Sequence, residues 1–495
     1  MTNPKVRDNQ LSFAGLVAIC VSAMIGSAIF DLPKNMATVA GATAQILAWI
    51  TTGIGMWLIA EVFMILSAVK PDLTAGMYDY GVKGFGPFVG FLTAWGYFVS
   101  NCATNAAFAV LVMNTLNYFF PGTFAGGNNW PSMIGASLLT WGMTGLTLKG
   151  TKSSNRMQKI AMTLLMVVIT VLIISLMGNF SWEKFTTDMQ ANVVMPSVHN
   201  LNLGSVSQQT LATMMVTLWM FSGIEGAAVM AGRAKKRSQV RMATLVGFLI
   251  CITIDILISL LSLGVFSYGQ LMRRLASPST AAILTSIWHN VWGRNIISLT
   301  LILTVLASWI SWLEMICELP QHAAEQDGTF PRAFAKTNAN DQPVFAILVA
   351  TVTIQAIILM AHFDGQAYEK LLLISAATTI PPYLVAEAYL FKIAVHHEYS
   401  GKHHPKRGMI IAGLAFVYTL LMGVSAGLKY TVAEFIVYLV GMPMYLYARR
   451  QHGQIVFSHA EKILAAVIIV IAVLGIDVLM GLIKQPFMTL LSLGH

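Results

Sequence analysis

The chain has 495 residues, of which 56% are hydrophobic and only 10% are charged, and its mean hydropathy is +0.69. Such a composition leaves too little polar surface to cover a soluble globule, so we expect an all-α polytopic membrane protein that forms a single domain over residues 1–495. The net charge of +9 does not indicate nucleic-acid binding, because the basic residues fall between apolar segments, where membrane proteins carry their charge bias.

Apolar segments recur along the whole chain. A membrane-spanning helix needs about 20 apolar residues, and by this measure we expect about 12 to 13 spans. The candidate spans are Leu11–Leu32, Ala42–Leu66, Phe88–Leu116, Met133–Leu148, Met157–Met177, Leu211–Met230, Met242–Tyr268, Ile297–Leu319, Val344–Ala361, Leu371–Ala394, Met409–Leu428, Val432–Tyr447 and Ile463–Ile483.

The distribution of Lys and Arg predicts the orientation. If the N-terminus is cytoplasmic, alternate connections face the cytoplasm and hold most of the 30 Lys and Arg residues, as the positive-inside rule requires. The Lys and Arg residues that would not face the cytoplasm in this orientation are Lys34, Lys184, Arg273, Arg274, Arg294, Lys370, Lys429 and Lys484. We therefore expect a multi-pass protein of the cell (inner or plasma) membrane, with the lipid bilayer as a partner.

The first span contains small residues where a helix needs strong helix formers. Gly26 and Ser27 lie at the centre of the stretch from Ala23 to Phe30, which favours a helix that breaks halfway across. Unwound backbone is tolerated at membrane depth only where it is buried in protein or lines a cavity, so a break predicts a binding site. The alternative is that the small residues only allow two unbroken helices to pack closely.

The sixth span repeats this interruption at Ser222, Gly223 and Gly226 and adds the carboxylate of Glu225. Because the two spans cross in opposite directions, they predict an inverted repeat of five plus five helices with broken helices 1 and 6. The repeats would cover residues 11–177 and 211–394, and the helices at 409–483 would be accessory.

An amino acid suits two such breaks. Its carboxylate would bind free N–H groups around Gly26 to Ala28 together with the Ser27 hydroxyl, because the N-terminal end of a half-helix carries the positive pole of the helix dipole. Its ammonium group would bind backbone carbonyls near Met24, Trp219 and Ser222.

Several motifs carry a family resemblance. The run from Met24 to Phe30, followed by Leu32 and Pro33, resembles the glycine-serine-glycine first helix of the amino acid–polyamine–organocation superfamily. Trp219 to Gly226, followed by Arg233 to Lys236, resembles its sixth helix. The stretch from Gly76 to Tyr97 matches the region between its second and third helices, and the whole chain is similar to the basic amino acid/polyamine antiporter branch, closest to arginine/ornithine-type exchangers.

The resemblance implies roles for residues of this sequence. Gly26, Ser27 and Ala28 would take the substrate carboxylate, and Met24, Trp219 and Ser222 would offer carbonyls to its amine. Trp219 would also act as a gate, and Glu225 would couple gating to proton sensing. Residues of the third, eighth and tenth spans would surround the substrate side chain: Tyr97, Asn101, Asn105, Trp312 and Ser375.

Ionisable residues at membrane depth are functional candidates by default. Glu225 lies in a helix break, where its protonation would bias the two conformations. Glu314 and Glu318 follow Trp312 by less than two turns, so one of them could offset a cationic substrate, or they could form a buried structural pair. We expect Glu61 and Glu387 to be structural.

These observations favour a secondary antiporter that exchanges an external amino acid for a metabolically related internal amine or amino acid, as a monomer or a homodimer. The candidate pairs are arginine/ornithine and a decarboxylation pair such as histidine/histamine; the altered, polar third span favours the latter. A proton-coupled amino acid symporter is the alternative. An enzyme is disfavoured because the sequence lacks the HExxH, GxSxG and phosphate-loop motifs. The four cysteines lie in separate apolar segments, so we expect no metal site and no cofactor.

Overall fold

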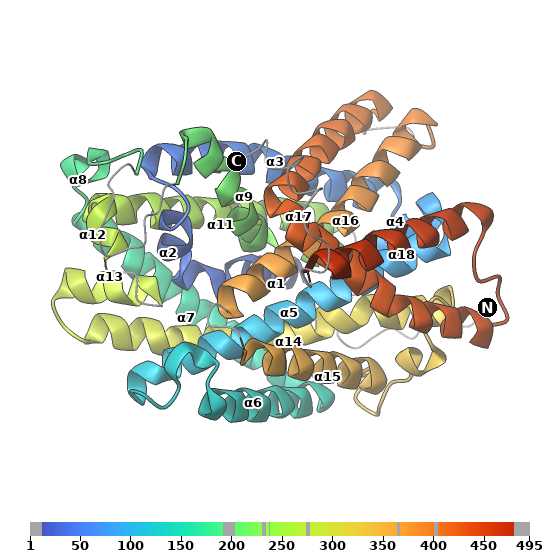
Figure 1. The fold of residues 1–495 in the computed structure, drawn as a ribbon, viewed down its shortest axis with the longest axis horizontal. Helices are drawn as coiled ribbons and strands as arrows, with labels where there is room; N and C mark the ends of the chain where they lie inside the picture. The colour runs from blue at the N-terminus through green and yellow to red at the C-terminus, as the bar shows by residue number, and fades with distance from the viewer. Residues whose placement is uncertain are drawn as a thin grey trace.

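The computed structural model describes residues 12–191, 203–229, 234–236, 238–273, 278–363, 367–399 and 404–479. Within these ranges the protein is helical, and its β-structure is one isolated bridge between Thr337 and Pro343. Leu11 and Arg233, which belong to the predicted first span and to the sixth-helix motif, lie outside them. Figure 1 shows long helices running side by side, with shorter ones at the ends of the bundle.

The helices, in chain order, are α1 (Phe13–Ile25), η1 (Ala28–Phe30), α2 (Leu32–Ala37), α3 (Ala42–Val69), α4 (Met77–Phe85), α5 (Pro87–Phe119), η2 (Ala125–Gly127), α6 (Trp130–Leu148), α7 (Thr151–Gly178), α8 (Trp182–Thr186), α9 (Val206–Phe221), α10 (Gly226–Val229), α11 (Ser238–Val265), α12 (Tyr268–Met272), α13 (Ser279–Trp288), α14 (Trp292–Gln326), η4 (Arg332–Ala335), α15 (Val344–Ala361), α16 (Ala367–Val395), α17 (Pro405–Gln451) and α18 (His459–Leu479).

Nine segments of the described chain are long and apolar enough to cross a membrane. They lie in α3, α5, α7, α11, α14, α15, α18 and the two halves of α17, which meet at Gly427, where φ is +79°. The remaining predicted spans coincide with α6, with α16, which contains Pro381 and Pro382, and with the interrupted pairs α1–α2 and α9–α10. The all-α architecture with broken first and sixth helices is thereby confirmed.

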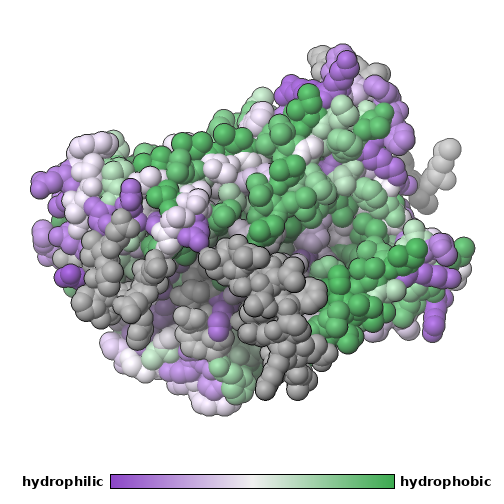
Figure 2. All heavy atoms as spheres, turned by 45° about the horizontal axis from the view of Figure 1, so that its top comes forward, coloured by the Kyte–Doolittle hydropathy of each residue, from purple (hydrophilic) through white to green (hydrophobic). Residues whose placement is uncertain are grey.

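The outer surface of the bundle is apolar. Large side chains that would be buried in a soluble protein are exposed on α6, α7 and α17, among them Leu138 (71% exposed), Ile174 (63%) and Val424 (75%). Figure 2 shows apolar residues across the middle of the visible face, with hydrophilic residues toward its left and right ends. An exposed apolar surface of this extent is explained by contact with lipid.

Helix packing reflects two equivalent halves. The first crossing packs against the seventh (α1 with α11), and the sixth packs against the second (α9 with α3). In the same way α5 packs against α16 and α15, while its counterpart α14 packs against α7 and α6. These reciprocal pairs are what an inverted five-plus-five repeat requires, because each contact in one half has its equivalent in the other.

Short helices lie at opposite ends of the bundle, with α4 at one end and α8, α12 and α13 at the other (Figure 1). The α13 end is joined to the first broken helix: Asp31 Oδ1 accepts a hydrogen bond from the Ser279 N–H (2.7 Å), and the Thr280 hydroxyl donates to the Phe30 carbonyl (2.8 Å). These two hydrogen bonds fix α13 to the segment that follows the first break.

Candidate functional site

The first break begins at Gly26. Its N–H still donates to the Ser22 carbonyl (3.2 Å), but its φ of +25° and ψ of −116° end α1, and a Cβ at this position would lie 3.2 Å from the same carbonyl oxygen. Glycine is required because L side chains rarely adopt this conformation. The expectation that the Gly26 N–H is free is therefore wrong for this conformation, since that group is already bonded.

The peptide groups beside Gly26 are the free ones. Within the described residues, the N–H groups of Ser27, Ala28 and Ile29 form no backbone hydrogen bond, and neither do the carbonyls of Met24 and Ile25. Buried backbone groups are almost always paired, so this set marks a place where a ligand or water completes the bonding. In this set of peptide groups, the N–H donors follow Gly26 in the chain and the carbonyl acceptors precede it.

The second break follows α9. Ser222 has extended ψ (127°), Gly223 has φ +104°, and the chain re-enters a helix at Gly226. The Ser222 N–H donates to the Trp219 carbonyl (3.2 Å). A Cβ on Gly223 would lie 2.5 Å from Cβ of Ala23, so the two breaks are in direct contact.

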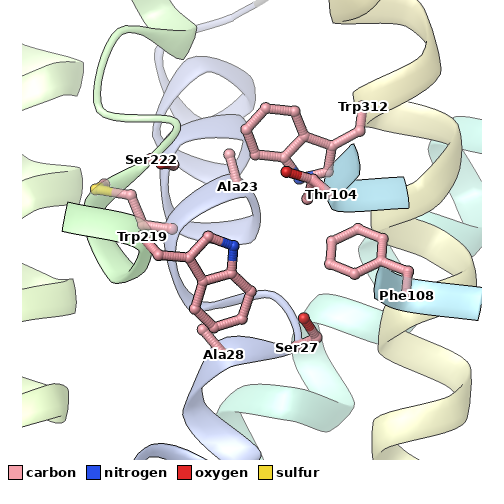
Figure 3. Close-up of a pocket in the computed structure, with 9 residues that line it drawn as sticks. Ala23, Ser27, Ala28, Thr104, Phe108, Trp219, Ser222 and Trp312 are labelled. Atoms are coloured by element: carbon pink, nitrogen blue, oxygen red, sulfur yellow. The ribbon is translucent and has the colours of Figure 1, made fainter. Parts of the chain in front are cut away.

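A small cavity lies between the breaks, with about 240 Å³ of atom-free space, part of it open to solvent. Figure 3 shows Trp219, Phe108 and Trp312 projecting into it from three different helices, with Ser27 below them. The full lining is Ala23, Met24, Ser27, Ala28, Thr104, Phe108, Trp219, Ser222 and Trp312. The described lining therefore contains hydroxyls, indole N–H groups, aromatic faces and backbone, but no carboxylate.

Some of the predicted site residues line the cavity in the structure, and the others lie outside its lining. Met24, Ser27, Ala28, Trp219, Ser222 and Trp312 line the cavity. Gly26 shapes the first break behind it, and the remainder lie outside the lining: Tyr97, Asn101, Asn105, Glu314 and Ser375. Ala23, Thr104 and Phe108 were missed by the sequence argument.

The rotation of the third span, α5, explains most of the disagreement between the predicted site residues and the observed cavity lining. The prediction followed the face that carries Asn101 and Asn105, but in the structure Thr104 and Phe108 face the cavity. Asn101 instead donates to the Tyr97 carbonyl of its own helix (2.8 Å), while the side chain of Asn105 is buried without a hydrogen-bond partner among the described residues. The spacing of four residues from Thr104 to Phe108 was an available signal.

Ser375 supports the cavity wall. Its hydroxyl bonds to that of Thr104 (2.7 Å), and its carbonyl accepts from Ser100 (2.7 Å), which also bonds to Thr379 (2.9 Å). This group of hydroxyls connects α5 to α16 and sets the rotation of α5. Glu314 is partly exposed and is not a lining residue.

Glu225 closes the space beside the second break. Its side chain is 1% exposed, and Oε2 accepts hydrogen bonds from the Tyr383 hydroxyl (2.7 Å) and the Gly223 N–H (3.1 Å). The Tyr97 hydroxyl forms no hydrogen bond among the described residues. Glu225 thus joins the broken helix α9–α10 to α16. The sequence argument assigned no role to Tyr383.

Tyr383→Phe is expected to slow transport about tenfold, because a hydrogen bond to a charged group contributes about 1.5–3 kcal/mol. The loss should be larger at alkaline pH, since an ionised Glu225 needs the donor more than a protonated one does. Initial uptake rates across pH values would measure it. Tyr399→Phe is the control, because the Tyr399 hydroxyl has no partner in the described chain. An equal defect at all pH values would contradict the assigned contact.

Among the described residues, no group of three or more His, Cys, Asp or Glu side chains is arranged to hold a metal ion. The four cysteines are buried and form no disulfide bond in the described structure. The cavity lining offers peptide groups, hydroxyls and indole rings, a set of groups suited to a small zwitterion.

Comparison with known proteins agrees with this geometry. The amino acid permease family model matches residues 11–432. A Clostridium perfringens protein assigned by name to amino-acid transport is 40% identical over 481 residues, which cover 95% of this chain and 98% of that protein. The arginine/agmatine antiporters of Chlamydia pneumoniae and Chlamydia caviae are 38% and 39% identical, and each alignment covers 93% of this chain, with 95% and 93% of the respective antiporter.

These relatives span the whole transporter, and neither they nor the family model is enzymatic, as the sequence predicted. Two helices broken at matching positions, an apolar cavity between them and a family match over most of the length lead to one conclusion. The chain belongs to the amino acid permease family, within the amino acid–polyamine–organocation superfamily.

Proposed function

We propose that this protein is an amino-acid antiporter that exchanges an external amino acid for a related internal amine or amino acid by alternating access. The single observation that carries the proposal is the set of unpaired peptide groups at the cavity. The free N–H groups of Ser27 and Ala28 suit a carboxylate, and the free carbonyls of Met24 and Ile25 suit an ammonium group.

The substrate pair is proposed from the lining and the relatives. Trp219, Trp312 and Phe108 would cover a flat or cationic side chain by stacking or cation–π contact. The relatives named arginine/agmatine antiporters exchange an amino acid for an amine, which favours a decarboxylation pair for this chain too. Arginine with agmatine or ornithine and histidine with histamine are the pairs to compare. In this proposal, Asn105 and Ser375 support the side-chain end of the site.

Orientation and domain division belong to the same proposal. The basic residues of the predicted cytoplasmic connections support an orientation in a cell membrane with the N-terminus and α4 in the cytoplasm and α13 outside. Residues 11–177 and 211–394 would form the two repeats that rock against each other, and 409–483 would be accessory.

Reconstituted vesicles test the function. Vesicles preloaded with agmatine, ornithine or histamine should take up labelled arginine or histidine only when the matching partner is inside, whereas empty vesicles should show little uptake. Uptake into empty vesicles driven by an acid exterior would instead support the proton-coupled symporter. Competition by unlabelled amino acids and amines would then rank the substrates.

A further inference from the structure

Asp255 is a buried carboxylate that the site described above does not use. It lies in α11 and is 1% exposed. One turn before it, Cys251 lies beside Cys20 of α1, and one turn after it, the Ser259 hydroxyl accepts a hydrogen bond from Trp49 Nε1 of α3 (2.7 Å). Residues four apart share a helix face, so Asp255 points toward the junction of α11 with α1 and α3.

One oxygen of this carboxyl group has no compensating partner among the described residues. Its Oδ1 atom is buried without a hydrogen bond there, and no basic side chain of the described chain forms an ion pair with the group. Other buried acids of the spans each have a hydrogen-bond donor: Glu225 bonds to Tyr383, Glu387 to Thr419 and Glu434 to Tyr438. An ionised carboxylate buried without a donor costs several kcal/mol, and a neutral carboxylic acid avoids this cost.

The described surroundings of Asp255 include no basic side chain that forms an ion pair with it. The Cys251 thiol lies beside it on its own helix, and Cys20 of α1 lies beside Cys251. Charged residues on the other packed elements include Lys34 on α2, Lys159 on α7 and Lys184 on α8; Lys184 bonds to the Val265 carbonyl at the far end of α11 (3.0 Å).

We propose that Asp255 is a proton-carrying site of the transport cycle, separate from Glu225. The helix that carries it, α11, packs against α1 and α10, the helices that border the two breaks, so a movement of the breaks would also change the access of water along α11 to Asp255. The carboxylate would form an O–H bond with a proton from water on one side, and that bond would break to return the proton to water on the other. The proposal rests on the proposed function, because it requires a carrier that alternates.

A proton suits the site better than a metal cation does. Sodium- or calcium-type ions require several oxygen ligands around them. Within the described chain, Asp255 belongs to no group of three acidic, His or Cys side chains that could supply such a shell, and the hydroxyl of Ser259 is already occupied by Trp49. A lone carboxyl group needs only its own two oxygens to bind a proton.

The test uses the full-length protein in vesicles that contain a pH-sensitive dye. The same amino acid is placed on both sides, so that the substrate itself transfers no net charge or proton, and the exterior is made acidic. We expect the wild type to admit protons only while it exchanges substrate. Asp255→Asn should exchange within about threefold of the wild-type rate, while substrate-dependent proton entry falls at least about tenfold, because the amide cannot ionise.

Matched variants complete the experiment. Asp255→Glu keeps a carboxyl group and should retain proton entry. Glu434→Gln neutralises another buried acid, one bonded to Tyr438 on α17, and should retain both activities. Unchanged proton entry in Asp255→Asn would overturn the proposal, as would exchange by the wild type without any proton entry, whatever the variants do.

Two other results are also decisive. A sodium requirement for wild-type exchange that Asp255→Asn abolishes would show that the carboxylate holds a metal cation, and the proton proposal would be wrong. Failure of the wild type to exchange any tested substrate would overturn the proposed function and this inference together, whereas exchange without proton entry would overturn the inference alone.

Discussion

Replacing Gly223 with alanine is expected to reduce exchange at least about thirtyfold. The new Cβ would lie 2.5 Å from Cβ of Ala23 and 3.1 Å from its carbonyl carbon, so the two broken helices could no longer touch. Gly223 also has φ +104°, which an alanine adopts only with strain. Backbone strain costs about 1–3 kcal/mol and overpacking another 1–3 kcal/mol. Each 1.4 kcal/mol corresponds to about tenfold in rate when it acts on the conformational step.

Gly142 provides the matched control for this substitution. It lies in α6, where an added Cβ would meet no atom within 4 Å, and its φ is not in the positive range. Gly142→Ala should therefore transport like the wild type, or be slightly more stable, because alanine favours a helix. Initial exchange rates and the thermal unfolding midpoint in detergent would be measured for both proteins. Wild-type exchange by Gly223→Ala would show that the contact between the breaks is not needed.

Ser27→Leu is the second substitution with a large expected effect. We expect the exchange rate to fall below about 1% of the wild-type rate, which corresponds to an increase of roughly 2.7 kcal/mol or more in the free-energy barrier. Ser27 is buried in the lining of this small cavity, beside the N–H groups proposed to hold the substrate carboxylate. A leucine there would occupy substrate space and remove a hydroxyl donor. Uptake of the labelled substrate and its stabilisation of the protein against heat should both disappear.

Two variants separate this effect from misfolding. Ser27→Ala removes only the hydroxyl and should lose about two- to tenfold, since one neutral hydrogen bond contributes about 0.5–1.5 kcal/mol. Thr163→Leu makes a similar enlargement on the exposed face of α7 and should transport normally. If Ser27→Leu folds and retains the wild-type affinity for substrate, the cavity is not the binding site.

The sequence predicted the crossings and their breaks because those features depend on local composition. Apolar length identifies a span, and glycine beside serine at its centre identifies an interruption. Gly26 and Gly223 do both take positive φ, as an interruption requires. The alternative of two unbroken, closely packed helices is excluded.

Helix rotation was less predictable. Asn105 and Thr104 are neighbours in sequence, yet they lie about 100° apart around a helix, and only Thr104 lines the cavity. That rotation is fixed by hydrogen bonds between α5 and α16, such as Thr104 to Ser375, which join residues far apart in the chain. The sequence argument did not identify Asp255 and Tyr383 for the same reason. Their importance depends on the presence or absence of hydrogen-bonding partners on other helices.

The bonds between α13 and the first broken helix have a mechanical consequence. Ser279 and Thr280 are held by Asp31 and by the Phe30 carbonyl, so the half-helix α2 cannot tilt away from the bundle without pulling α13 along or breaking both bonds. The helices α2 and α13 therefore move as one unit. Opening on that side would switch between two positions, with no partly open state through which water could leak past these helices.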